Sequence, residues 1–61
     1  MEQLTITIGD TDIDVDFRGF SRWFLFKNGK RMKGLERWIM RSAKRHDDFN
    51  EKCDDALREA A

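Results

Sequence analysis

Residues 35–60 read LERWIMRSAKRHDDFNEKCDDALREA, and this stretch decides the fold that we expect. Within it, steps of four and three residues connect one series of side chains: Leu35, Ile39, Ser42, His46, Phe49, Cys53, Ala56 and Ala60. Because no Gly or Pro interrupts this heptad spacing, it predicts a stripe along one face of a single long helix. We therefore expect a helix over about residues 35–60, and we expect the upstream residues to pack against it.

The upstream residues are typical of an antiparallel sheet that begins with a hairpin. Residues 4–8 and 13–17 each alternate apolar with polar side chains, which predicts two half-buried strands. A two-residue turn at residues 10–11 would place Ile8 opposite Ile13 and gather the apolar side chains of both strands on one face. The other face would then carry three acids, Asp12, Asp14 and Asp16.

Residues 20–27 predict a third strand that is rich in aromatic side chains. If Phe17 lies opposite Arg22 across the pair, the even-numbered aromatic residues of this strand point toward the core. The same register leaves two large apolar side chains on the solvent-exposed face, Trp23 and Leu25.

The sequence therefore predicts a single α+β domain that occupies residues 1–61. Asn28-Gly29 is a strong hairpin signal because both residue types tolerate positive φ, and a short fourth strand over residues 30–32 can follow it. We expect an antiparallel sheet of three or four strands over about residues 3–33, followed by one long C-terminal helix.

The length of this helix favours a dimer. A helix of about 25 residues is about 37 Å long, whereas a strand of about six residues spans about 20 Å. The sheet would cover only half of the helix, so either the helix breaks near residues 46–48 and folds back, or a second chain covers the rest. We favour a two-fold homodimer. Its seam would contain Ile39, His46, Phe49 and Cys53.

The charged residues form three blocks, although the formal net charge is zero. Residues 1–17 carry a charge of −5, residues 18–45 carry +9, and residues 46–61 carry −4. The acidic blocks can neutralise the basic block within the chain, or the basic block can bind an anionic partner. The bases that lie at helical spacing within this block are Arg37, Arg41, Lys44 and Arg45.

The residue types argue against catalysis and against a bound metal or cofactor. The single cysteine, Cys53, allows no disulfide within the chain, and one Cys with one His falls short of a zinc ligand set. His46 and Cys53 would lie about 10.5 Å apart along a helix, too far for a nucleophile–base pair. The acidic run over residues 10–16 lacks the Gly and the Glu that a calcium loop needs. We expect no enzyme, no cofactor and no metal.

We therefore expect a small non-enzymatic protein that binds another protein and inhibits or regulates a larger complex, a class that includes phage-encoded inhibitors of host systems. The residues expected at the partner interface are Asp12, Asp14, Asp16, Trp23, Leu25, Arg37, Arg41, Lys44 and Arg45. The alternatives are a nucleic-acid-binding regulator that uses the basic block 27–45, and a component of a larger assembly. The longest apolar run, residues 23–26, is too short to cross a membrane, so we expect a cytoplasmic protein with no membrane partner. No motif assigns the chain to a family.

Overall fold

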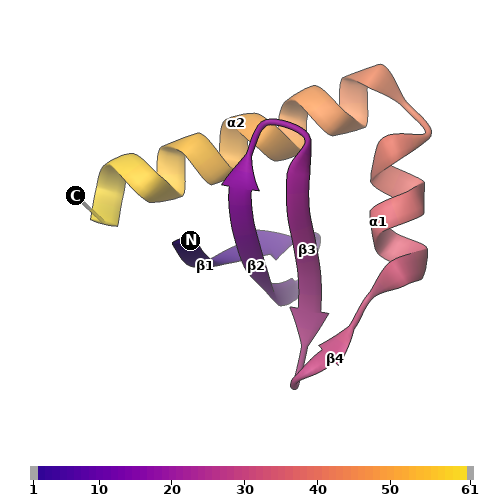
Figure 1. The fold of residues 1–61 in the computed structure, drawn as a ribbon, viewed down its shortest axis with the longest axis horizontal. Helices are drawn as coiled ribbons and strands as arrows, with labels where there is room; N and C mark the ends of the chain where they lie inside the picture. Colours follow the sequence, from indigo (N-terminus) through magenta and orange to yellow (C-terminus); the bar gives the residue numbers. More distant parts are fainter. Residues whose placement is uncertain (1, 61) are drawn as a thin grey trace.

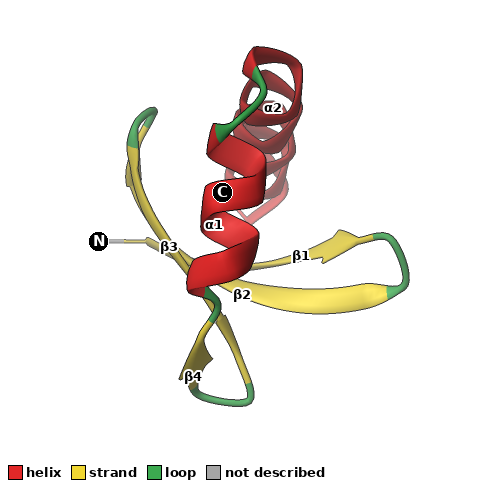
Figure 2. Ribbon diagram, turned by 90° about the vertical axis from the view of Figure 1, so that its right-hand side faces the viewer, coloured by secondary structure: helices red, strands yellow, loops and turns green. Residues whose placement is uncertain are grey.

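The computed structural model describes residues 2–60, which form an antiparallel four-stranded sheet followed by two helices (Figure 1). The elements are β1 (Glu2–Ile8), β2 (Thr11–Gly19), β3 (Arg22–Lys27), β4 (Lys30–Arg31), α1 (Lys33–Met40) and α2 (Ala43–Ala60). The strands are hydrogen-bonded in the order β1-β2-β3-β4, and both helices lie on the same side of the curved sheet (Figure 2). The predicted α+β class is confirmed, with α2 as the long C-terminal helix.

The first hairpin has the predicted core face but a different turn. β1 and β2 pair Ile6 with Ile13, so the two-residue turn lies at Gly9-Asp10 and not at residues 10–11. The predicted register is therefore wrong by two residues. Gly9 has a φ of 62°, a conformation that glycine adopts at no steric cost, and this places the turn one residue earlier. Because side chains alternate with a period of two, the shift leaves the same apolar side chains on the core face.

The third strand presents the opposite face from the one that the sequence predicted. Phe17 pairs with Trp23, whereas Gly19 pairs with Arg22, so β2 holds one extra residue between these two pairs. Such a β-bulge changes the register by one residue and thereby exchanges the two faces of the next strand. Gly19, with a φ of 145°, supplies the backbone conformation that this irregularity requires. The predicted pairing of Phe17 with Arg22 is wrong.

Trp23 and Leu25 are consequently core residues, with 7% and 0% of their surface exposed. The prediction that they contact a partner from an exposed face is wrong, because the bulge turns them toward the helices. Phe24 and Phe26 lie half-buried on the outer face instead, paired with acidic residues of β2. The Asn28-Gly29 turn lies where the sequence predicted it, with φ values of 53° and 79°.

The predicted helix over residues 35–60 is divided by a break at Ser42, not at residues 46–48. The Ser42 Oγ accepts a hydrogen bond from the backbone N–H of Arg45 at 3.4 Å, and its carbonyl accepts one from that of His46 at 2.9 Å. A serine in this place caps a helix N-terminus, because it satisfies a backbone N–H that has no partner within the helix. Ser42, one of the two polar residues in the heptad series, is thus the cap that begins α2.

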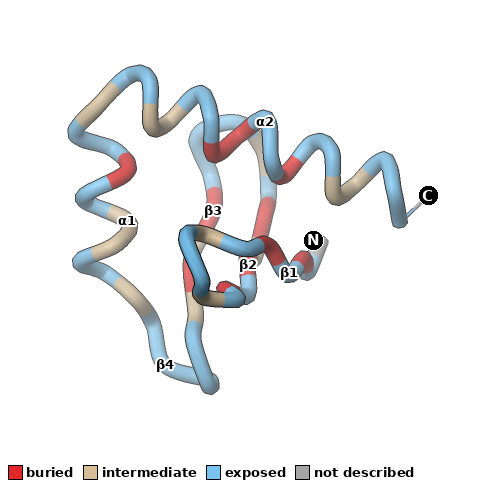
Figure 3. The backbone as a smooth tube through the Cα atoms, turned by 180° about the vertical axis from the view of Figure 1, so that it is seen from behind, coloured by how far each residue is buried: buried red, intermediate tan, exposed pale blue. Residues whose placement is uncertain are grey.

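The break lets the apolar stripe cover the sheet of its own chain. Ile39, Phe49 and Cys53 are 2%, 3% and 0% exposed, and they join the buried side chains of the strands in one core. Figure 3 shows the buried segments of α2 where this helix passes the β2–β3 hairpin. The stripe therefore does not overhang the sheet, and the reason for expecting a dimer seam at Ile39, His46, Phe49 and Cys53 is wrong. The homodimer itself stays a prediction without that support.

Candidate binding surface on helix α1

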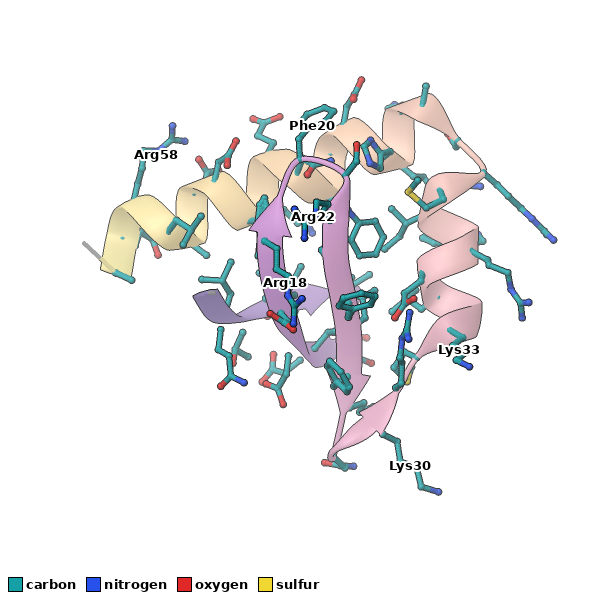
Figure 4. All side chains as sticks on the ribbon, viewed as in Figure 1. Arg18, Phe20, Arg22, Lys30, Lys33 and Arg58 are labelled. Atoms are coloured by element: carbon teal, nitrogen blue, oxygen red, sulfur yellow. The ribbon has the colours of Figure 1, made fainter. Side chains whose placement is uncertain are left out.

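Helix α1 carries its bases on the side that faces away from the sheet. Ile39 is buried in the core. With 3.6 residues per turn, the opposite side of the helix carries Lys33, Arg37 and Arg41, and all three are exposed. Lys44, in the first turn of α2, is also exposed. We call Lys33, Arg37, Arg41 and Lys44 the basic face. Figure 4 shows Lys33 on the outer side of α1.

The ion pairs among the described residues do not include the basic face. Within residues 2–60, the ion pairs are Arg18–Asp16, Arg31–Glu36 and Arg58–Asp55. None of these pairs includes a residue of the basic face. The acids of the described residues therefore form ion pairs with bases elsewhere on the surface. Arg37, Arg41 and Lys44 are exposed and take part in none of these pairs.

Glu36 holds α1 against the edge of the sheet. Its carboxylate accepts two hydrogen bonds from Arg31, at 3.0 Å from Nε and 2.9 Å from Nη2, and a third from the backbone N–H of Leu25 at 3.1 Å. Burial disfavours the charged carboxylate, but these hydrogen bonds and the charges of Arg31 and Lys33 outweigh burial and lower the pKa of Glu36. One carboxylate therefore joins α1, the helix that carries Lys33 and Arg37 of the basic face, to both β3 and β4.

Replacing Glu36 with alanine should lower the free energy of unfolding by about 1–3 kcal/mol, because the Leu25 N–H then lacks its acceptor. Glu36→Gln keeps an oxygen for that N–H and loses only the ion pair, so its loss should be smaller. The folded pKa lies below the unfolded value of about 4.3. The ion-pair contribution is therefore complete above the unfolded value and is lost as the pH falls through the folded one.

Urea titrations from neutral to strongly acidic pH measure this contribution. The native chain should lose more stability on acidification than Glu36→Gln, because only the native chain has this carboxylate to protonate. Parallel losses in the two proteins would show that the Arg31–Glu36 pair does not stabilise the fold.

Trp38 lies beside the basic face and is 50% exposed. The guanidinium of Arg45 lies over its ring at 4.4 Å from the centroid, and the Arg45 Nε donates a hydrogen bond to the Trp38 carbonyl at 2.8 Å. A cleft of about 180 Å³ opens next to this pair, and we call it the Trp38 cleft. Its lining residues are Ile8, Trp38, Ile39, Arg45, Asp48, Phe49 and Lys52.

The predicted acidic residues lie on the outer face of the sheet, apart from the basic face. Asp14 accepts a hydrogen bond from the Thr5 hydroxyl at 3.1 Å, and Asp12 accepts one from the Thr7 hydroxyl at 2.9 Å. Asp16 forms an ion pair with a neighbouring arginine of its own strand. These carboxylates therefore already have hydrogen-bond or ion-pair partners on the strands, and no ion pair within residues 2–60 joins them to α1.

His46 and Cys53 have surroundings that explain them as packing residues. The His46 ring contacts the rings of Phe20 and Trp23, with centroids 5.2 Å and 6.3 Å apart. Phe20 lies at the tip of the β2–β3 hairpin, next to α2 (Figure 4). Burial and the charge of Asp54 raise the pKa of the Cys53 thiol to about 12, so the thiol is protonated at neutral pH. Among the described residues, no group of three His, Cys, Asp or Glu side chains could hold a metal ion.

Sequence reasoning missed the Trp38 cleft. On one continuous helix, Trp38 and Arg45 would lie about 10.5 Å apart along the axis. The break at Ser42 brings these two side chains to stacking distance, and the first hairpin brings Ile8 to the same place. No residue spacing in the sequence signals such a contact.

Comparison with protein-family models, with curated proteins and with solved structures finds no match to this chain. None of the helices in the described part of the chain is long and apolar enough to span a membrane. The basic face and the Trp38 cleft are therefore the features from which we infer a function.

Proposed function

We propose that this chain is a non-enzymatic binding protein that engages an acidic surface of another protein through the basic face of α1, and that this contact inhibits or regulates the partner's complex. One observation carries the proposal: Arg37, Arg41 and Lys44 are exposed and take part in no ion pair within residues 2–60. Like charges four residues apart on a helix repel each other, so Arg37 and Arg41 destabilise the free helix. An acidic partner surface relieves that repulsion on binding.

The apolar side chains beside the bases favour a protein partner over nucleic acid. Trp38 and Met40 are 50% and 54% exposed, and Trp and Arg are prominent among the residues that dominate the binding energy of protein interfaces. Nucleic acid is the second candidate, because the bases of block 27–45 can also contact phosphates. Against it, the chain carries 12 acids and 12 bases, whereas nucleic-acid-binding domains are typically basic.

Reversing two charges of the basic face tests the proposal. Arg37→Glu combined with Arg41→Glu should weaken binding to poly-L-glutamate, a defined acidic probe, by about tenfold, because each exposed ion pair contributes up to about 1 kcal/mol. Fluorescence anisotropy at low and at physiological salt measures the loss. Arg22→Glu combined with Lys30→Glu is the matched control, since it reverses two exposed charges outside the basic face (Figure 4).

The control variant should retain most of the affinity for poly-L-glutamate. Equal losses in the two double variants would show that net charge, and not the basic face, determines binding. A short DNA duplex measured in parallel distinguishes the second candidate. If the native chain prefers the duplex, and Arg37→Glu with Arg41→Glu removes that preference, the basic face is a nucleic-acid site.

A further inference from the structure

We infer that the Trp38 cleft receives one large apolar side chain from an acidic peptide segment, whose carboxylates contact the basic face. This inference rests on the proposed function and adds the chemistry of the partner. The occupant is a segment of a different protein, and three features of the cleft lead to this assignment: its apolar floor, its fixed wall and the bases around it.

The floor of the cleft is apolar and already packed. Ile39 and Phe49 are only 2% and 3% exposed, and Ile8 is partly buried against the same core. The cleft holds about 180 Å³. Since an apolar cavity of about 150 Å³ can hold a benzene molecule, this space suits a single side chain such as leucine or phenylalanine. An apolar side chain that enters the cleft loses its contact with water, which favours binding.

The wall of the cleft is held in place before any partner arrives. Arg45 fixes Trp38 twice, through its guanidinium at 4.4 Å from the ring centroid and through a hydrogen bond of 2.8 Å to the carbonyl. On another side, the Lys52 Nζ donates a hydrogen bond to the Thr7 carbonyl at 3.1 Å. A site that is ordered in the free protein loses less side-chain freedom on binding.

The charges around the cleft select an acidic segment. The lining contains two bases, Arg45 and Lys52, and one acid, Asp48. Arg37 lies on the same helix as Trp38, and Arg41 is the C-terminal cap of that helix. Both lie within one turn of Trp38, and both are exposed. An apolar residue in the cleft would therefore have bases close to its neighbours, and carboxylates on those neighbours would complement these charges.

A second copy of this chain is a poor occupant. The large hydrophobic side chains exposed among residues 2–60 are Phe20, Trp38 and Met40. Each has an arginine close by in the sequence: Phe20 follows Arg18, Trp38 follows Arg37, and Met40 precedes Arg41. Inserting any of them into the Trp38 cleft of another copy would bring like charges together. The complementary partner is therefore a different, acidic protein.

Two fluorescein-labelled peptides test the inference by anisotropy. Both are short and alternate glutamate with serine, and one carries a central phenylalanine in place of a serine. The native chain should bind the phenylalanine peptide about tenfold or more tightly than the plain peptide, as expected for burying one large apolar side chain. Trp38→Ala should remove this preference, so that the two peptides bind this variant with equal affinity.

Two further variants locate the effect. Phe20→Ala removes another exposed aromatic side chain, 62% exposed, outside the cleft, so it should keep the full preference. Arg41→Glu should weaken the binding of both peptides alike, because it changes the basic face and leaves the cleft intact.

Quenching of tryptophan fluorescence by acrylamide tests the same contact directly. It should fall when the phenylalanine peptide covers Trp38. Thermal melts establish that each variant is folded.

The outcomes separate the inference from the function on which it rests. Equal binding of the two peptides by the native chain would overturn the inference and leave the basic face as an acid-binding site. A preference that survives in Trp38→Ala would also overturn it, because the apolar side chain would then bind elsewhere. Failure of both peptides to bind at low salt would overturn the inference together with the proposed function.

Discussion

Trp23→Ala should lower the free energy of unfolding by about 3–5 kcal/mol, the range for truncating a buried aromatic side chain. Trp23 is 7% exposed, and its ring centroid lies 4.3 Å from that of Phe49. A chain of 61 residues has a total stability of about 3–9 kcal/mol at typical values per residue. The variant should therefore lose between about a third and all of its stability. Urea titration followed by circular dichroism measures the loss.

The neighbouring residue on the same strand is the matched control for this prediction. Phe24 lies half-buried on the outer face, with the guanidinium of Arg31 over its ring at 4.4 Å from the centroid. Phe24→Ala should cost no more than about 1.5 kcal/mol, because it opens no cavity in the core. The register predicted from the sequence implies the reverse order. A larger loss for Phe24→Ala than for Trp23→Ala would therefore contradict the bulge between Phe17 and Gly19.

Hydrophobic alternation predicted the core face of the first hairpin although the predicted turn was wrong. Leu4, Ile6, Ile13 and Val15 face the core in either register, because the two registers differ by two residues. In the third strand, by contrast, the predicted and observed registers differ by one residue, so the predicted core face was the wrong one. A bulge of one residue reverses its faces, and the sequence around Gly19 indicates a turn without indicating how many residues it absorbs.

The helices show a second limit of periodic patterns. Ser42 occupies a position of the heptad series and also begins α2, so the series continues across a break that it does not reveal. The expected overhang assumed a straight helix on a flat sheet. In the structure the sheet curves and the helix divides, and Ile39, Phe49 and Cys53 of the stripe are buried within one chain (Figures 2 and 3).

The two parts of the candidate site differ in how far the sequence could predict them. The four-residue spacing of Arg37 and Arg41 is visible in the sequence, and both residues belong to the basic face. The sequence did not show that Lys44 and Arg45 lie beyond a helix break, on α2, or that Arg45 contacts Trp38. The Trp38 cleft depends on Ile8 and Phe49, which are 41 residues apart in the chain and meet only through the fold. The exposed bases on α1 could thus be predicted, whereas their division between two helices and the apolar cleft beside them required the tertiary structure.

Phe49→Ala should also cost about 3–5 kcal/mol, and the urea midpoints of both the native chain and the variant should not change with protein concentration. Phe49 is 3% exposed within a single chain and packs on Trp23 of that chain, so its contribution does not require a second copy. If Phe49 lay in a dimer seam, unfolding would be coupled to dissociation, and the midpoint would rise with concentration.

Phe20→Ala is the matched control, because it makes the same truncation at a side chain that is 62% exposed, and it should cost less than about 1 kcal/mol. Titrations over about a hundredfold range of protein concentration separate the two models of the stripe. A midpoint that rises with concentration in the native chain, and no longer rises in Phe49→Ala, would return this residue to a dimer seam. A constant midpoint would leave α2 with one structural role, which is to cover the sheet of its own chain.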